Sequence, residues 1–250
     1  MGYRDMSKSL LGFAENIHSQ NGEDGIIAEI LRRLSITSGW FVEFGAWDGK
    51  RMSNTWNLAE RGWSGVFIES NVKKFRELQQ NTKTLCGSIH TIHSWVAIGG
   101  PRSLDNLLAK IPLPPNFDVL SIDIDSYDYF VWQSLTRYSP RIVIIEINSS
   151  FAPQVRRTHR EDSIRPGSSF RSVLELGTAK GYTLVCHTGN MIFVKSELAS
   201  KLNLPAAELR DPQMLFVDTW RKRWILDLPL CCAKWLRTKV LRIVAQRAEG

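Results

Sequence analysis

Short apolar runs alternate with helical stretches along most of the chain from residue 40 onward. Each run spans four to eight residues and is flanked by polar or turn-forming residues, a pattern typical of strands buried in a mostly parallel sheet. The predicted strands are residues 40–44, 65–69, 90–97, 119–123, 142–147, 183–186 and 191–194. Helical spacing between them predicts helices on both faces of the sheet, and therefore an α/β fold.

The last two predicted strands are joined by residues 187–190, which are rich in turn formers and few enough for a hairpin. The seventh strand should therefore run antiparallel to its neighbour. An N-terminal helix entered through the polar residues 19–25 should cap the sheet. A later helix should begin at Ser168 or Ser169 and end before Gly181.

Length and composition indicate a globular protein without a membrane span. The 250 residues, 43% of them hydrophobic, can fill one sizeable core. The longest apolar stretches are far shorter than the roughly 20 residues that cross a bilayer. Charged residues interrupt the N-terminus, so no secretory signal is expected and a cytoplasmic protein is predicted. The four cysteines show neither zinc-ligand nor disulfide spacing.

The strand and helix pattern stops near residue 203, so we expect one domain over residues 1–202 and an extension over residues 203–250. Of the net charge of +7, +6 falls in residues 220–250, where eight lysine and arginine residues accompany two acids. A basic amphipathic helix over residues 231–247, with tryptophans nearby, would suit peripheral contact with an anionic membrane. Alternatively, its apolar side packs on the domain or on a second copy in a homo-oligomer.

Two glycines and two acids mark a candidate ligand site. Gly45 and Gly49 follow the first predicted strand and let the backbone approach a ligand at the carboxyl edge of the sheet. Their spacing is Gly-x-x-x-Gly, not the Gly-x-Gly-x-x-Gly pattern that seats a pyrophosphate. Glu69 can accept hydrogen bonds from both hydroxyls of a ribose, and Glu43 can face a cationic group. A nucleoside without phosphates fits both features; the alternative is a tight turn beside a solvated strand end.

Four motifs in this order resemble those of FkbM-type methyltransferases. They are SQNGED at residues 19–24, VEFGAWDG at 42–49, SNT at 53–55 and GWSGVFIE at 62–69. The resemblance continues more loosely to about Leu198 and is absent from the last fifty residues. It implies a class I methyltransferase fold, a Rossmann-like seven-stranded sheet that is mostly parallel with an antiparallel last strand. It also implies S-adenosylmethionine as the cofactor and O-methylation of sugars or related natural products.

Carried over residue by residue, the resemblance places residues of the later motifs around the cofactor and the segment at residues 19–24 beside them. These predicted cofactor-binding residues are Gln20, Gly45, Asp48, Asn54 and Glu69. We add residues in the same turn or at the ends of neighbouring strands, where open α/β sheets bind ligands. The added residues are Glu43, Ala46, Ser70, Ala97 and Asp123.

Polar side chains also end the fourth and fifth predicted strands. Strand alternation puts Asp123 and Asp125 on one face, and likewise Glu146 and Asn148. Asp125, Glu146 and Asn148 are a candidate site for Mg²⁺, which would lower the pKa of a substrate hydroxyl, as in catechol O-methyltransferase, which this arrangement resembles. In the metal-free alternative, Asp123 or Asp125 takes the hydroxyl proton as general base. A third alternative is that the acids only cap the next helix.

His159 and His187 fall after the fifth and sixth strands, where substrate-facing loops are expected, so either could be an alternative base. The basic residues 156–160 could orient an acidic sugar or phosphate, or form a solvated loop.

Three functions compete. The leading hypothesis is an O-methyltransferase for a hydroxyl of a sugar, a glycolipid or other lipid-linked glycan, or a polyketide-type small molecule. The basic tail would suit methylation of nucleic acid. However, the fourth strand ends in DIDS at residues 123–126, not in the Asn/Asp-Pro-Pro-Tyr motif of many base N-methyltransferases. The third function is a non-catalytic binding or scaffold protein with the same fold.

Overall fold

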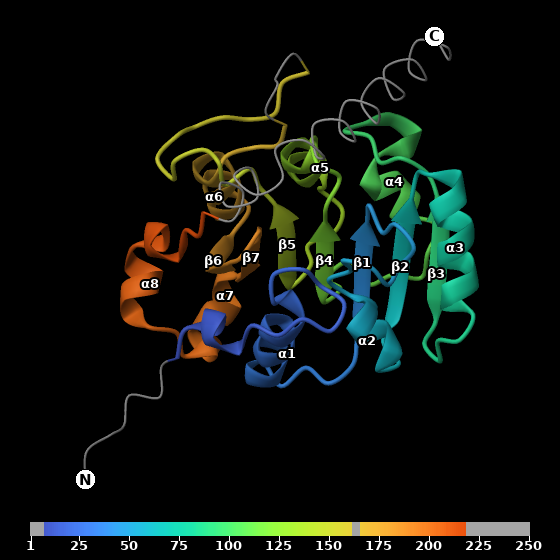
Figure 1. Cartoon of the computed structure of the whole chain (residues 1–250), viewed down its shortest axis with the longest axis horizontal. Helices are drawn as coiled ribbons and strands as arrows, with labels where there is room; N and C mark the ends of the chain where they lie inside the picture. Colours follow the sequence, from blue (N-terminus) through green and yellow to red (C-terminus); the bar gives the residue numbers. More distant parts are fainter. Residues whose placement is uncertain (1–7, 162–165, 219–250) are drawn as a thin grey trace, which may run out of the picture.

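The computed structural model describes residues 8–161 and 166–218. Its centre is a seven-stranded sheet in the order β3-β2-β1-β4-β5-β7-β6 (Figure 1). The strands are β1 (Trp40–Phe44), β2 (Ser64–Glu69), β3 (Ile89–His93), β4 (Val119–Ile122), β5 (Ile142–Glu146), β6 (Tyr182–His187) and β7 (Asn190–Lys195). Each strand overlaps the run that the sequence predicts for it.

The strands β1 to β5 pair in parallel, whereas β7 is antiparallel to both β5 and β6. β7, the last strand among the described residues, therefore lies between β5 and β6, and β6 forms one edge of the sheet. This arrangement confirms the predicted fold: the chain has the Rossmann-like, class I methyltransferase topology with an antiparallel last strand.

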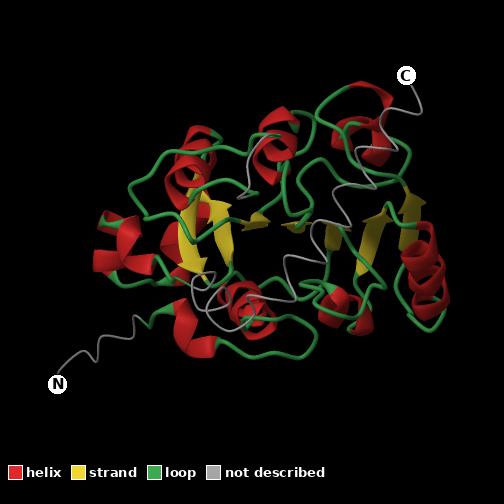
Figure 2. Ribbon diagram, turned by 45° about the horizontal axis from the view of Figure 1, so that its top comes forward, coloured by secondary structure: helices red, strands yellow, loops and turns green. Residues whose placement is uncertain are grey.

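Helices cover both faces of the sheet (Figure 2). One layer contains α4 (Leu104–Leu108), α5 (Asp128–Ser134) and α6 (Phe170–Ala179); the other contains α1 (Glu23–Arg33), α2 (Trp56–Glu60), α3 (Val72–Thr82) and α7 (Ser196–Ala199). The shorter segments are η1 (Leu10–Phe13), η2 (Gly100–Arg102), η3 (Ser200–Leu202), α8 (Ala206–Arg210) and η4 (Pro212–Leu215). Because successive side chains alternate along a strand, Val143 of β5 joins the first core and Ile144 the second.

Side-chain caps fix where two helices begin. Ser169 Oγ accepts a hydrogen bond from the Ser172 N–H, which selects Ser169 from the two predicted starts of α6. Asn71 Oδ1 caps α3 by accepting from the N–H groups of Lys73 and Lys74 at 3.0 and 3.2 Å.

The third strand is shorter than the sequence predicts. Its neighbour β2 ends at Glu69, opposite His93, so the following residues have no strand to pair with. The Ser94 N–H donates to the Glu69 carbonyl at 3.1 Å, and Ser94 Oγ donates to the Trp95 carbonyl at 2.8 Å. The predicted strand end at residue 97 is therefore wrong, and Ala97 instead forms an isolated bridge with Ser103.

The beginning of the predicted extension packs on the domain. Phe216 stacks on His187 with ring centroids 5.5 Å apart, and the Val217 N–H donates to His187 Nδ1 at 2.9 Å. The predicted amphipathic helix over residues 231–247 lies outside the described residues. Among residues 8–161 and 166–218, no helix combines the length and apolar character needed to cross a membrane.

Candidate cofactor site

The carboxyl ends of β1 and β4 meet where the order of the strands reverses. The chain continues from β1 to β2 and β3 on one side, whereas β4 and β5 lie on the other. In open α/β sheets, such a switch point leaves a crevice in which ligands bind. Gly45 follows β1 directly and is exposed here, between the buried Phe44 and Ala46.

Gly45 is required by the close approach of two backbone segments. Its φ is +77°, and an ideal Cβ on it would lie 1.7 Å from the Asp123 carbonyl oxygen. On the other side, the N–H groups of Gly45 and Ala46 donate to the Ile68 carbonyl at 3.1 and 3.2 Å. The loop after β1 is therefore held against both neighbouring strands, and only glycine leaves room for this approach.

Glu69, at the end of β2, binds the backbone of adjacent loops. Its Oε2 accepts from the Trp47 N–H at 2.8 Å, and its Oε1 accepts from the Asn71 N–H at 2.5 Å. A carboxylate oxygen has two lone pairs, so each oxygen can accept a further hydrogen bond. Glu69 thus retains the acceptor capacity that the predicted ribose contact requires.

Glu43 anchors the SNT motif that follows the first loop. Its Oε2 accepts from Ser53 Oγ at 2.6 Å and from Thr55 Oγ1 at 2.7 Å, and its Oε1 accepts from the Asn54 N–H at 2.9 Å. Burial raises the pKa of the Glu43 carboxyl, and these hydrogen bonds oppose that rise. The first role of Glu43 is therefore to position the SNT motif, and its direct contact with a cofactor remains a prediction.

Asp48 and Asn54 brace the same loop. Asp48 Oδ1 accepts from the N–H groups of Lys50 and Arg51 at 3.0 and 2.9 Å, which closes a turn. Asn54 Nδ2 donates to Ser121 Oγ at 3.0 Å and so links the loop to β4. Both side chains are buried.

The segment before α1 is held by two buried acids. Asp24 Oδ2 accepts from three consecutive N–H groups, those of residues 17–19, at 2.7 to 2.9 Å. Glu23 Oε1 accepts from Thr188 Oγ1 at 2.6 Å and from Asn190 Nδ2 at 3.0 Å. This link to the last hairpin is not predictable from the sequence, because the partners are more than 160 residues apart and carry no common motif.

Three predicted cofactor residues lie in the segment before α1 and in the loops after β2 and β3. Gln20 is half-buried, and its carbonyl accepts from Asn16 Nδ2 at 3.1 Å. Ser70 is exposed, and its carbonyl accepts from His93 Nε2 at 3.1 Å. Ala97 is half-buried in the loop after β3.

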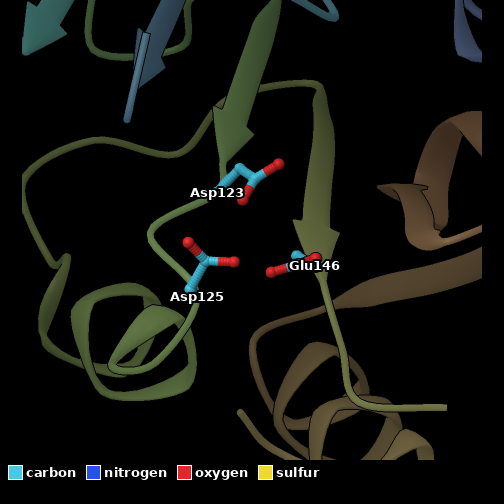
Figure 3. Close-up of side chains that lie close together, drawn as sticks. All are labelled: Asp123, Asp125 and Glu146. Carbon is cyan, nitrogen blue, oxygen red and sulfur yellow. The ribbon is translucent and has the colours of Figure 1, made fainter. Parts of the chain in front are cut away.

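Asp123, Asp125 and Glu146 form an acidic cluster in which one oxygen from each lies within 4.8 Å of the others (Figure 3). Asp123 follows β4, Asp125 comes from the next turn with φ +63°, and Glu146 ends β5. The three acids meet because the carboxyl ends of adjacent parallel strands lie at the same edge.

Negative charges gather around Asp123 and disfavour its ionisation. Burial raises the pKa of Asp123 well above its usual range, and the nearby charges of Asp125 and Asp128 raise it further. The charges of Glu43 and Glu23 act in the same direction. Such a field stabilises a cationic ligand and repels a phosphate.

Asp128 is a further buried acid of this region, to which the sequence alone assigns no role. It begins α5, and its carboxylate oxygens accept from the N–H groups of Ile124 and Ser126 at 2.8 Å each. Burial raises its pKa to about 7. Asp128 thus fixes the turn that presents Asp125. The available signal was its position just after the fourth predicted strand, where acids could cap the next helix.

Asn148 takes part in a different arrangement from the three carboxylates. β5 ends at Glu146, so strand alternation no longer applies two residues later. Asn148 Oδ1 accepts from the Ser150 N–H at 3.0 Å, and Nδ2 donates to the Pro166 carbonyl at 2.7 Å. The Asn148 amide thus serves this turn, and its part in a metal site stays a prediction.

His159 is buried where the loops after β4 and β5 meet. Its ring lies edge-to-face with Tyr127 at 4.9 Å, and Nδ1 accepts from the Gly167 N–H at 3.3 Å. Tyr127 Oη donates to Glu161 Oε1 at 2.8 Å, and burial together with this contact raises the pKa of Tyr127 to about 12. His159 is thus held in place between two candidate substrate loops.

His187 does not lie in a substrate-facing loop as expected, because it ends β6. Its ring packs against Phe170 and Phe216 and is 1% exposed. Burial lowers the pKa of His187 to about 3. A neutral imidazole enclosed by rings stabilises the fold and is not accessible to a substrate.

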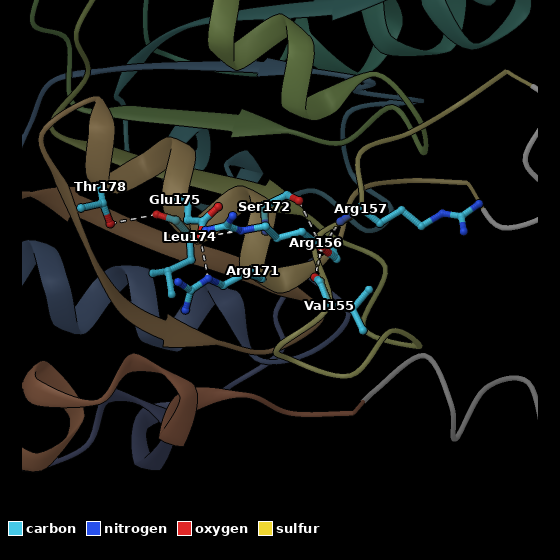
Figure 4. A network of polar contacts seen from close by, with 9 residues as sticks. Val155, Arg156, Arg157, Arg171, Ser172, Leu174, Glu175 and Thr178 are labelled. Atoms are coloured by element: carbon cyan, nitrogen blue, oxygen red, sulfur yellow. Dashed lines mark hydrogen bonds and ion pairs between the residues drawn. The ribbon is translucent and has the colours of Figure 1, made fainter.

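The basic segment after β5 is partly neutralised (Figure 4). Arg156 Nε and Nη2 donate to Glu175 Oε1 at 3.0 and 2.6 Å, and Arg171 Nε donates to the same oxygen at 2.6 Å. Arg156 therefore binds an acid of α6, which weakens the expectation that it orients an acidic substrate.

No protein-family model and no curated protein matches the sequence. Similar solved structures include an S-adenosylmethionine-dependent methyltransferase from Clostridium acetobutylicum, with 8% identity, 68% of this chain and 88% of that one covered, and a TM-score of 0.43. A TehB-like S-adenosylmethionine-dependent methyltransferase from Corynebacterium glutamicum is 12% identical over 74% of this chain and 92% of its own, with a TM-score of 0.42. A candidate caffeoyl-CoA O-methyltransferase from Staphylococcus aureus is 14% identical over 74% of this chain and 87% of its own, with a TM-score of 0.47. At such identities the chemistry has to rest on the residues of this chain.

Proposed function

We propose that the protein is a methyltransferase that uses S-adenosylmethionine. The observation that carries this proposal is the switch point between β1 and β4, where the exposed backbone of Gly45 adjoins a field of carboxylates. S-adenosylmethionine joins cationic sulfonium and ammonium groups to a nucleoside without phosphates. A negative field favours that combination and opposes a dinucleotide.

The residues present fit this cofactor in their chemistry. Glu69 retains lone pairs for two ribose hydroxyls, and the acidic cluster of Asp123, Asp125 and Glu146 offers carboxylates to an ammonium group. α2 begins only at Trp56, so no helix N-terminus directly follows Gly45 to bind a phosphate. When bound, S-adenosylmethionine supplies an electrophilic methyl group.

We further propose a hydroxyl as the acceptor, carried by a sugar, a glycolipid or other glycan, or a polyketide-type molecule. The four FkbM-like motifs support this class. The site supports it as well, since a carboxylate with a raised pKa, such as Asp123, can take the proton of a hydroxyl during its attack. Asp125 and His159 are the other candidate bases.

The alternative to a metal-free base is a divalent cation such as Mg²⁺ bound at the acidic cluster. Its three carboxylates are hard oxygen donors, and their mutual repulsion is a cost that a cation would relieve. A bound cation would supply the positive charge that lowers the pKa of an acceptor hydroxyl.

Calorimetry with S-adenosylmethionine and S-adenosylhomocysteine tests the main proposal. We expect saturable binding of both, weakened by at least about tenfold in Asp123→Asn, and unchanged in Asp211→Asn, a matched change at the N-cap of η4. Absence of binding by the folded wild-type protein would support the scaffold function instead.

Titration with Mn²⁺ tests the metal. We expect Asp125→Asn and Glu146→Gln each to weaken Mn²⁺ binding by at least about tenfold, whereas Glu197→Gln on α7 leaves it unchanged. If wild-type protein binds no Mn²⁺, the metal-free base is the remaining mechanism.

A further inference from the structure

We propose that Asn190, the first residue of β7, contributes its amide oxygen to a divalent-cation site together with the acidic cluster. Asn190 is paired with Glu146 in the antiparallel ladder of β5 and β7. Directly opposite residues of an antiparallel pair project to the same face, with their Cβ atoms about 5 Å apart. A residue of the last hairpin, which no motif of the sequence marks, therefore lies beside a carboxylate of the acidic cluster.

Both side chains lie on the α1 side of the sheet. Ile144 and Ile192 lie two residues away along their strands and pack in the core that faces α1. Because side chains alternate along a strand, Glu146 and Asn190 continue that face to the edge of the sheet. A hydrogen bond to α1 confirms this for Asn190, whose Nδ2 donates to Glu23 Oε1 at 3.0 Å.

Glu23 fixes which end of the Asn190 amide carries the oxygen. A carboxylate only accepts hydrogen bonds, so the amide nitrogen must face Glu23 and the amide oxygen must face away. Glu23 is fully buried and held by two further donors: Thr188 Oγ1 donates to Oε1 at 2.6 Å, and the Asn21 N–H donates to Oε2 at 2.8 Å. The orientation of the Asn190 amide is therefore fixed by an anchored acid.

The Asn190 amide oxygen is buried and accepts a hydrogen bond from none of the described residues. The residue as a whole is 6% exposed. A buried acceptor without a donor is costly, so each such atom in a folded protein requires an explanation. Its neighbours on this face, Glu146 and Glu23, end in carboxylates, which accept rather than donate. The oxygen is therefore suited to a ligand that brings a donor or a positive charge.

The acidic cluster decides between these two kinds of ligand. One oxygen from each of Asp123, Asp125 and Glu146 lies within 4.8 Å of the others (Figure 3). The charge of Glu23 helps to raise the pKa of Asp123, so Glu23 and the acidic cluster belong to one region. A neutral donor would satisfy the Asn190 oxygen but leave the repulsion between the carboxylates. A divalent cation would satisfy both, and carboxylate and amide oxygens are its preferred ligands.

Asn148, the amide that the sequence predicts for this site, is already engaged at both ends. Its Oδ1 accepts from the N–H and from the hydroxyl of Ser150, and its Nδ2 donates to the Pro166 carbonyl. An amide oxygen has two lone pairs, so these contacts use its capacity. Asn190 uses only its nitrogen, which makes its oxygen the better candidate ligand.

Titration of the full-length protein with Mn²⁺, followed by electron paramagnetic resonance, tests the proposal. We expect Asn190→Ala to weaken Mn²⁺ binding by at least about tenfold. Thr188→Val is the matched control, because it removes another hydrogen bond to the same Glu23 oxygen but leaves the Asn190 amide in place. Its Mn²⁺ affinity should stay near that of the wild type. Equal affinities of Asn190→Ala and wild type would overturn the proposal, as would equal losses in the two variants.

A change of ligand chemistry separates direct coordination from mere support of the hairpin. Asn190→Cys replaces the amide oxygen by a thiol, which favours the soft Cd²⁺ over Mn²⁺. The ratio of Cd²⁺ to Mn²⁺ affinity should rise at least about tenfold over that of the wild type, with the ultraviolet absorption of a Cd²⁺–thiolate bond. The wild type is the control for the native Cys86 and Cys186. No rise and no absorption would contradict direct coordination.

The cation site deepens the proposed function and rests on it for its chemical role, but the two can fail separately. Calorimetry with S-adenosylhomocysteine, without added cation, measures cofactor binding alone. Wild-type protein that binds S-adenosylhomocysteine but no Mn²⁺ would overturn the cation site and leave the proposed function intact. Mn²⁺ binding that depends on Asn190, without binding of S-adenosylhomocysteine, would support the cation site and reject the function.

Discussion

The Asp123 carbonyl oxygen occupies the place that a side chain on Gly45 would need, 1.7 Å from an ideal Cβ. Any substitution at Gly45 must push apart the loops after β1 and β4. We therefore expect Gly45→Ala to destabilise the protein by more than about 1 kcal/mol and to weaken S-adenosylmethionine binding at least about tenfold. Urea unfolding and calorimetry measure the two effects.

Gly62→Ala is the matched control, because Gly62 has a similar φ of +83° but nothing within 4 Å of an ideal Cβ. It should cost about 1 kcal/mol through the backbone alone and leave the cofactor affinity unchanged. Equal losses of affinity in the two variants would contradict the importance of the Gly45–Asp123 approach.

Glu69→Gln keeps the size of the side chain but exchanges one acceptor oxygen for an N–H donor. Two backbone N–H groups and two ribose hydroxyls require acceptors at this position, so the affinity for S-adenosylmethionine should fall at least about tenfold. Glu77→Gln, an exposed position on α3, is the control. An affinity equal to that of the control would remove Glu69 from the proposed ribose contact.

Arg32 and Arg33 both form ion pairs with Glu29, but one arginine side chain is exposed and the other is nearly buried. The Arg33 side chain is 9% exposed, pairs with Glu29 at 2.7 Å and donates to the Leu202 carbonyl at 2.6 Å. The Arg32 side chain is 72% exposed and pairs with the same Glu29. In urea unfolding, Arg33→Met should cost about 2–3 kcal/mol and Arg32→Met less than about 1 kcal/mol. The reverse order would show that burial does not decide the value of these pairs.

Acid should destabilise the protein through His187. Burial holds its pKa at about 3 in the folded state, whereas an unfolded histidine titrates near about 6.5. As pH falls from about 6.5 to about 3, the unfolded chain gains a proton that the folded chain lacks. Stability should therefore decrease by up to about 1.4 kcal/mol per pH unit.

The control for this pH dependence is His187→Asn, whose amide oxygen can accept the Val217 N–H without titrating. Urea midpoints measured across this window should fall less steeply in the variant. The same slope in both proteins would assign the acid sensitivity to other groups.

The sheet could be predicted from the sequence because the strands carry continuous apolar runs. β5, for example, reads Ile142 to Ile145 without a polar residue and is buried on both faces. The Gly45 turn and the meeting of Asp123 with Glu146 were also predictable, since both follow from the shared edge of parallel strands.

Other features depend on contacts that local patterns do not contain. β3 ends at His93 because its neighbour ends, which no property of residues 94–97 signals. Asn148 follows a strand by two residues, and whether its side chain continues the alternation depends on the turn. The turn-forming residues next to His187 indicate a loop, yet His187 is buried because Phe216 stacks on its ring.

The hydrogen bonds of Glu23 to Thr188 and Asn190 join residues that are made at very different times during translation. A ribosome produces Glu23 early and the last hairpin late, so a nascent chain that ends before Thr188 has a carboxylate without its two side-chain donors. We therefore expect the Glu23 side chain to gain its final partners only after Thr188 and Asn190 have emerged. The candidate site would then be completed only when nearly the whole sheet has been translated.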